Sequence, residues 1–266
     1  MLHNLLRFIL KHTYWRDGCV RRILLGPSAG QVYRIFPKYG LAPTFGRWEP
    51  DLQNLMVKIL EPGQTAYDVG ANYGIHTLLM SRLVGVGGCV CAFEPHPSIH
   101  KSCRENIDLN RIANVKLLNV GLGATSGDLP YSEGHHEGAG HFVAGFPDAD
   151  SITLRCETID GLVAAQKIPV PDFLKIDVEG FEGDVLAGAM ATTQEHHPTF
   201  AIDLHTPEQD VLVGHFMEKL GYEVYRQNGL KRIKKLEAGW PDPEGVYGTI
   251  LAIHPSRQAL RSRLGV

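Results

Sequence analysis

Residues 65–84 read TAYDVGANYGIHTLLMSRLV, a short apolar segment followed by a turn with two glycines and an apolar helical segment. Gly70 and Gly74 let the chain turn tightly and bring backbone N–H groups next to a ligand at the start of a helix. The order strand, turn, helix predicts a nucleotide-binding βα unit. Asn72 stands where the Gly-x-Gly-x-x-Gly pattern of NAD-binding proteins has its second glycine, so the spacing here differs from that pattern.

Two acids accompany this turn. Asp68 precedes Gly70 by two residues, and a carboxylate there suits a ligand with an ammonium group and repels a pyrophosphate. S-adenosylmethionine carries an α-ammonium group and a sulfonium. Glu94 ends the next apolar segment, where nucleotide-binding βαβ units place the acid that accepts hydrogen bonds from ribose hydroxyls.

From Thr65 onward, short apolar segments alternate with helical ones, which predicts a Rossmann-like α/β fold with a mostly parallel sheet and helices on both faces. A C-terminal antiparallel hairpin is expected from residues 221–227 and 246–254. Residues 121–160 are the least regular region, and residues 134–150 within it are expected to form a loop or flap. The expected strands are 65–69, 88–94, 115–120, 172–177 and 199–204, and the expected helices are 51–60, 74–84, 97–110, 180–190 and 207–221.

The predicted organisation is a helical and irregular extension over residues 1–60, one catalytic domain over 61–255 and a basic surface tail over 256–266. The 29 acidic and 26 basic residues are nearly balanced, which disfavours an electrostatically driven nucleic-acid binder. No base-flipping motif is evident either, so a nucleic-acid methyltransferase is disfavoured.

The cysteines and the N-terminal segment indicate the compartment of the protein and its relation to the membrane. Five cysteines do not suggest a disulfide framework in so long a chain, and we expect reduced thiols in the cytoplasm. The first segment, MLHNLLRFILKHTYW, is too short to span a bilayer, so no transmembrane helix is expected there. It predicts a docking helix, with interfacial membrane contact as the alternative.

Charged residues also follow the two later strands. In DFLKIDVEG, residues 172–180, the side chains of Lys175, Asp177 and Glu179 would share one side of a continuing strand. The next strand carries Asp203 and His205 to the same edge, and ligands of open α/β sheets bind at the carboxyl ends of the strands. His205 has a pKa range suited to general-base catalysis.

These segments resemble the FkbM family of methyltransferases. The resemblance rests on DVGANYGIHT, AFEPHPSIHKSCRENIDLN, DFLKIDVEGFEGDVLAGA and FAIDLH, in that order, with GRWEPDLQ upstream. It implies S-adenosylmethionine-dependent O-methylation of a hydroxyl on a sugar or specialised metabolite. By the matching motif positions it also implies that Glu94 holds the ribose and that Glu49 closes over the cofactor. The methionine part would be held by Asp68, Gly70, Asn72 and Gly74.

The family pattern leaves the catalytic base open. We expect it to be His205 or Asp177, with Glu179 orienting the acceptor and Lys175 lowering the pKa of its hydroxyl. As an alternative, Asp177, Glu179 and Asp203 would hold Mg²⁺ through carboxylate oxygens. A second group, His135, His136, Glu137 and His141, has the composition of a transition-metal site but is also typical of a solvated loop.

The expected partner is a small-molecule or glycan hydroxyl acceptor. Two other classes of protein compete with this interpretation. An NAD-dependent oxidoreductase would use Glu94 in the same way, and a non-catalytic nucleotide-binding module would leave Asp177, Glu179 and His205 idle.

Overall fold

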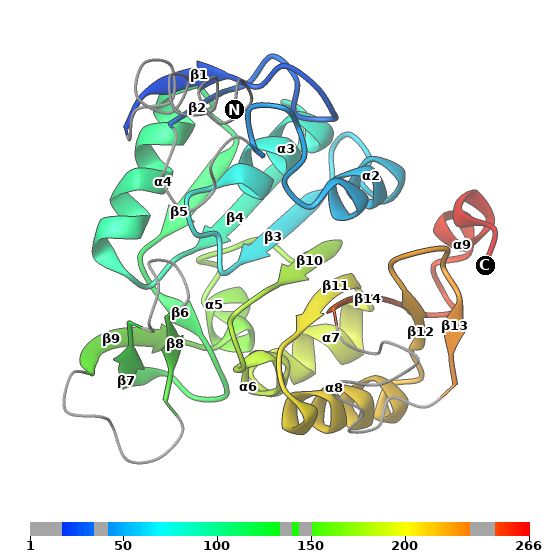
Figure 1. The fold of residues 1–266 in the computed structure, drawn as a ribbon. Helices are drawn as coiled ribbons and strands as arrows, with labels where there is room; N and C mark the ends of the chain where they lie inside the picture. Colours follow the sequence, from blue (N-terminus) through cyan, green and yellow to red (C-terminus); the bar gives the residue numbers. More distant parts are fainter. Residues whose placement is uncertain (1–17, 35–41, 134–139, 144–150, 235–247) are drawn as a thin grey trace, which may run out of the picture.

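The molecule is built on one central sheet. The computed structural model describes residues 18–34, 42–133, 140–143, 151–234 and 248–266. Eight strands follow the order β13-β12-β14-β11-β10-β3-β4-β5 (Figure 1). The five central strands are parallel, namely β3 (Thr65–Val69), β4 (Cys89–Phe93), β5 (Val115–Leu118), β10 (Phe173–Ile176) and β11 (Thr199–Leu204).

The remaining three strands close one side of this sheet. Strand β14 (Gly248–Ile253) runs antiparallel between β11 and β12 (Glu223–Arg226), and β13 (Arg232–Ile233) forms the edge. The β12–β14 pair is the expected C-terminal hairpin. The predicted α/β class, with a mostly parallel sheet, is confirmed.

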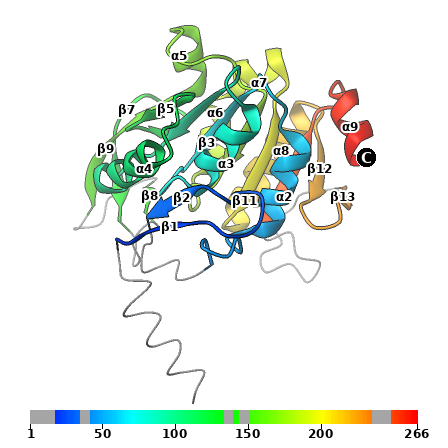
Figure 2. The same cartoon turned by 90° about the horizontal axis from the view of Figure 1, so that it is seen from above.

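Helices cover both faces of the sheet because successive strand residues point to opposite sides. Val90 packs in the cluster that holds the apolar side chains of α2 (Pro50–Ile59) and α3 (Ile75–Val84), while Cys91 packs with α5 (Ile159–Ala164) and α8 (Pro207–Lys219). Helix α4 (Pro97–Leu109) shares the face of α3. Figure 2 shows α2 lying beside α3.

The helix expected over residues 180–190 is wrong in its extent. Glu179 and Gly180 adopt left-handed φ angles of 55° and 101°, so the chain turns before α6 (Glu182–Ala187) begins. Helix α7 (Met190–His196) then starts separately. Its first N–H groups donate to the carboxylate of Asp160, a remote residue that caps the new helix.

The region 121–160, expected to be the least regular, contains strands in its described part, whereas most of the expected loop at 134–150 lies outside the described residues. A second sheet has the order β6-β9-β7-β8. Its strands are β6 (Gly121–Leu122), β7 (Gly127–Ser132), β8 (His141–Phe142) and β9 (Ile152–Glu157). Strand β9 alternates apolar and polar residues, a strand signal that the prediction missed, and Pro130 within β7 disguised its partner. His135, His136 and Glu137 lie outside the described residues.

Both outer segments contact the central domain. Strands β1 (Val20–Arg22) and β2 (Val32–Arg34) form a hairpin against α4, and α9 (Gln258–Leu264) lies against α2, where Arg263 donates to the carbonyl of Ile59 at 2.9 Å. The domain limits at residues 60 and 255 stay a prediction. All five cysteines lie in the described part and none forms a disulfide. Within that part no helix is long and apolar enough to cross a bilayer.

Asn106 joins three parts of the fold and generates a first prediction. It is fully buried, donates to the carbonyl of Tyr73 at 2.9 Å and accepts from the N–H of Arg34 at 2.9 Å. Asn106→Ala leaves both backbone groups without this partner, and each buried unsatisfied group costs about 1–3 kcal/mol. We expect urea denaturation to show a loss of about 2–3 kcal/mol in the free energy of unfolding. Asp108→Ala, exposed on the same helix, serves as the control; equal midpoints for the two variants would contradict this role of Asn106.

Candidate active site

The turn after β3 is held by close backbone packing. Gly70 and Gly74 have φ angles of 76° and 86°, and Asn72 between them has 51°. A Cβ atom on Gly70 would lie 1.9 Å from the carbonyl oxygen of Asp177, and one on Gly74 would lie 2.7 Å from Cys103 Sγ. Both glycines are therefore required because the turn approaches β10 and α4 so closely.

The N–H groups of this turn are used inside the protein. Residues 70 and 71 donate to the carbonyl of Phe93, residue 72 to Glu94 Oε2, residue 73 to Asn72 Oδ1 and residue 74 to the carbonyl of Ala71, at 2.8–3.1 Å. The sequence analysis predicted that backbone N–H groups of this turn face the ligand. The five N–H groups of residues 70–74 instead donate to acceptors within the protein. A pyrophosphate would find a carboxylate here rather than free N–H donors, which disfavours a dinucleotide.

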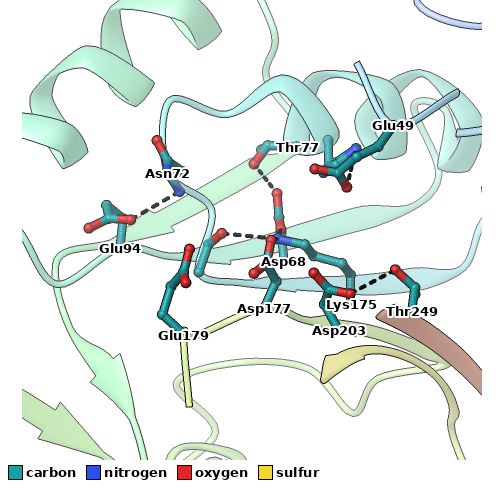
Figure 3. A network of polar contacts seen from close by, with 12 residues as sticks. Glu49, Asp68, Asn72, Thr77, Glu94, Lys175, Asp177, Glu179, Asp203 and Thr249 are labelled. Atoms are coloured by element: carbon teal, nitrogen blue, oxygen red, sulfur yellow. Dashed lines mark hydrogen bonds and ion pairs between the residues drawn. The ribbon is translucent and has the colours of Figure 1, made fainter. Parts of the chain in front are cut away.

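Glu94 stands at the end of β4 with its carboxylate fixed. One oxygen accepts the N–H of Asn72 at 3.0 Å (Figure 3), and the other accepts the N–H of His96 at 2.9 Å. The residue is only 4% exposed, and this burial raises its pKa to about 7. Glu94 thus lines a pocket at the carboxyl end of β4, and its role as a ribose acceptor stays a prediction.

That first pocket has both polar and apolar walls, and Glu94, Asp177 and Glu179 are among its polar residues. It has a volume of about 620 Å³, including the part open to solvent. The second sheet contributes Tyr131 and Phe142, whose rings pack edge to face with centroids 5.4 Å apart. Further walls come from Phe93, Ile99, Leu122 and Phe181. An apolar slot beside a hydrogen-bonding carboxylate fits a nucleoside.

A second pocket of about 360 Å³ adjoins the first. Gly70, Asn72 and Asp177 line both pockets, so the two spaces meet at the turn. Glu49 and Lys175 lie in the second pocket, as do Trp48, Tyr73 and His76, which the sequence analysis did not single out. Burial, followed by the charge of Asp177, raises the pKa of Glu49 to about 7.

Lys175 is buried between two carboxylates. It stands opposite Asp68 in the parallel register, with Nζ 3.4 Å from Asp68 Oδ1 and 3.2 Å from Asp177 Oδ2. Nζ also donates to the carbonyl of Gly70 at 3.0 Å (Figure 3). Burial alone would lower the pKa of Lys175, but Asp177, Asp68 and Glu49 raise it above its ordinary value. The lysine therefore stays charged and engaged.

Asp68 lies behind the pockets rather than in their walls. Its side chain is fully buried, and Oδ2 accepts from Thr77 Oγ1 at 2.6 Å. Gly74 likewise packs against Cys103 and does not line either pocket. The structure thus brings Gly70, Asn72, Glu94 and Glu49 to the pocket walls, while Asp68 contacts the pockets only through Lys175.

His205 is the centre of an acidic cluster. Its Nδ1 lies 2.8 Å from Oε1 of the fully buried Glu182, and its Nε2 lies 3.6 Å from Asp177, 3.6 Å from Glu179 and 3.7 Å from Asp203. Burial alone would lower the pKa of His205, but Glu182 and the other carboxylates raise it to about 9. Sequence reasoning missed Glu182, although it lies three residues after Glu179 in the quoted segment.

The same cluster has the donors for a cation. Asp177, Asp203 and His205 each offer a ligand atom, and these atoms lie within 4.8 Å of one another. Burial raises the pKa of Asp203 to about 6, and Thr249 donates to its Oδ1 at 3.1 Å. The predicted catalytic residues Lys175, Asp177, Glu179 and His205 therefore form one continuous set at the carboxyl edge of the sheet.

Comparison with known protein families decides the assignment. Residues 68–227 match the family model described as the methyltransferase FkbM domain. The chain belongs to the FkbM methyltransferase family. The family that the sequence resemblance indicated is therefore confirmed.

Two curated relatives match parts of this FkbM family member. The hexuronic acid methyltransferase AglP of Haloferax volcanii is 33% identical over 143 residues, which are 53% of this chain and 56% of the relative. A protein-L-isoaspartate O-methyltransferase of Aeropyrum pernix is 33% identical over 89 residues, 33% of this chain and 34% of the relative. The chain thus matches about half of the first relative and a third of the second.

Solved structures are similar at a lower level. An FkbM methyltransferase from Methylobacillus flagellatus KT is 17% identical with a TM-score of 0.48, covering 76% of this chain and 50% of that one. An S-adenosylmethionine-dependent O-methyltransferase from Thermotoga maritima is 15% identical with a TM-score of 0.43, covering 92% of this chain and 81% of that one.

The buried ion cluster around Lys175 generates a second prediction. Lys175→Met leaves Asp68 and Asp177 buried without this counter-ion, and we expect a loss of about 3–5 kcal/mol in the free energy of unfolding at pH 7. Without the lysine, the two neighbouring carboxylates repel each other, and protonation at low pH relieves this repulsion. The deficit should therefore shrink between pH 7 and pH 4 in urea denaturation. The exposed Lys167→Met is the control; a deficit independent of pH would exclude this explanation.

Proposed function

We propose that this chain is an S-adenosylmethionine-dependent O-methyltransferase that acts on a hydroxyl of a sugar or specialised metabolite. The observation that carries the proposal is the pair of pockets that meet at Gly70, Asn72 and Asp177. One pocket suits a nucleoside and the other a charged amino-acid group. Together they have the chemistry of one elongated ligand with both parts.

The residues present fit this cofactor. S-adenosylmethionine supplies, when bound, an electrophilic methyl group on a positively charged sulfur. In our proposal Glu94 accepts hydrogen bonds from the ribose hydroxyls, and Tyr131 and Phe142 exclude water from the adenine ring. Glu49 accepts from the α-ammonium group in the second pocket. Asp68 is a positioning residue, because it holds Lys175 and, through it, the carbonyl of Gly70.

His205 has the best geometry for the base. Its Nδ1–H donates to Glu182, which leaves Nε2 as the proton acceptor facing Asp177 and Glu179. Glu179 is more exposed than Asp177, with 38% and 26% of their side chains accessible, and we propose that it binds the acceptor hydroxyl. Lys175 lowers the pKa of Asp177 although burial opposes this, so Asp177 is the weaker base.

A divalent cation is the alternative for the same cluster. Asp177, Asp203 and His205 would hold it, with Mg²⁺ the expected ion. The hydrogen bond from His205 Nδ1 to Glu182 is the arrangement in which metal-binding histidines are usually oriented. A bound cation would make the acceptor hydroxyl more acidic, and His205 would then be a ligand rather than the base.

The sugar acceptor is supported by the relative that is described as a hexuronic acid methyltransferase. The alternative of an NAD-dependent oxidoreductase is disfavoured by the turn, because the N–H groups of residues 70–74 already have protein acceptors. A non-catalytic binding module would use the pockets but leave His205 without a task.

The cofactor is tested by calorimetric titration with S-adenosylhomocysteine and, separately, with NAD⁺. We expect micromolar binding of the first and none of the second. Glu94→Ala removes a charged acceptor whose hydrogen bonds contribute about 1.5–3 kcal/mol. It should therefore weaken S-adenosylhomocysteine binding about 10- to 100-fold. The exposed Glu195→Ala is the matched control. Binding of NAD⁺ alone would refute the proposal.

Binding must be followed by a search for turnover. Labelled S-adenosylmethionine is offered with neutral hexosides and with hexuronates as acceptors. Transfer to a hydroxyl supports the proposal, while tight binding with no transfer to any acceptor would favour the binding module.

The base and the metal alternative are separated by pH and chelation. If His205 is the base, it is protonated below a pKa of about 9, so kcat/KM should rise with pH and level off near 9, with EDTA having no effect. His205→Gln should lower kcat about 10²- to 10⁴-fold and leave S-adenosylhomocysteine binding unchanged. Loss of activity in EDTA that Mg²⁺ restores would instead assign His205 as a ligand.

A further inference from the structure

His76 is buried in the second pocket with an unsatisfied ring nitrogen. It is 4% exposed, lies in the first turn of α3, and its Nε2 has no hydrogen-bond partner among the residues that the structure describes. Glu49 Oε2 is 3.6 Å from this nitrogen, too far for a hydrogen bond. A buried polar group without a partner carries a free-energy cost, because it has lost its hydrogen bonds to water. A ligand that supplies the missing partner would therefore recover this cost.

The imidazole is neutral at physiological pH. Burial, and then the charge of Lys175, lowers the pKa of His76 to about 4, although Asp68 and Asp177 oppose this. A neutral imidazole carries one N–H and one acceptor nitrogen. Because Nε2 faces the carboxylate of Glu49, the tautomer with hydrogen on Nε2 is favoured. His76 thus presents an uncharged donor to the pocket.

The neighbours of His76 define what this donor would meet. Glu49 and Asp177 line the same pocket and suit a cationic group, whereas Lys175 is engaged with two carboxylates and a carbonyl. An α-amino acid carries its ammonium and its carboxylate on one carbon atom. Partners for the two groups must therefore lie side by side, as Glu49 and His76 do.

We propose that His76 Nε2–H binds the α-carboxylate of the methionine part of the cofactor while Glu49 binds the ammonium group. This inference rests on the proposed function and assigns His76 as a cofactor-specificity residue. The nucleoside part, held in the other pocket, is recognised without His76. The enzyme then distinguishes the full cofactor from fragments that lack the amino-acid group.

The test compares two ligands by calorimetry on the full chain. S-adenosylhomocysteine has the amino-acid group, and 5′-methylthioadenosine has the same nucleoside and sulfur without it. We expect His76→Leu to weaken S-adenosylhomocysteine about 10- to 100-fold, as for a hydrogen bond to a charged group, and to leave 5′-methylthioadenosine unchanged. Unchanged binding of the second ligand also shows that the variant is folded.

Two polar variants keep the inference testable if leucine is not tolerated. The amide of His76→Gln reaches the position of Nε2 and should retain much of the affinity, whereas the shorter amide of His76→Asn should not. Equal weakening of both ligands, or no change for S-adenosylhomocysteine, would overturn the inference. Failure of the wild-type protein to bind S-adenosylhomocysteine would instead overturn the proposed function and this inference with it.

Discussion

The ion cluster of Lys175 with Asp68 and Asp177 is the interaction on which the rest of the site depends. Adjacent strands β3 and β10 place the lysine directly opposite Asp68, and its ammonium group also holds the carbonyl of Gly70. The carbonyl of Asp177 in turn approaches Gly70 so closely that no side chain fits between them. Strand ends, turn and charged residues are thus fixed together, and the two pockets meet where they are fixed.

A charge imbalance runs through the site. Within the described residues, the carboxylates of Glu49, Asp177, Glu179 and Asp203 face only two nearby cations, Lys175 and His205. Such an excess of negative charge destabilises the empty site. A ligand with an ammonium and a sulfonium group relieves the imbalance, whereas a pyrophosphate would worsen it. The charges of the site therefore favour the cationic ligand of the proposed function over a dinucleotide.

Much of the fold could be predicted from local patterns. Strands β3 and β11 have the expected limits, because a buried parallel strand is a continuous apolar run between turn residues. The position of Glu94 was predictable for a similar reason, because it directly follows the apolar run of β4 and therefore lies at the carboxyl end of that strand. The second sheet was missed because the alternation in β9 was overlooked and Pro130 within β7 disguised the strand that pairs with it.

The roles within the site were harder to predict than its location. Sequence spacing brought Asp68 to the turn but could not show that it points into the core toward Thr77. Glu182 and His76 have ordinary neighbours in sequence, and only their burial beside His205 and Glu49 distinguishes them. The contacts, burial and orientation of a side chain depend on how the whole molecule packs. They cannot be read from the sequence of a single strand or helix.

The position of β14 has a consequence for how the protein is made. This strand lies between β11 and β12, yet it follows both in the chain. During synthesis, β11 leaves the ribosome with one side unpaired, and β12 can pair only with the short β13 until residues 248–253 emerge. The sheet is therefore completed late, when β14 inserts between two strands that are already made. Until then the nascent chain exposes an unpaired strand edge.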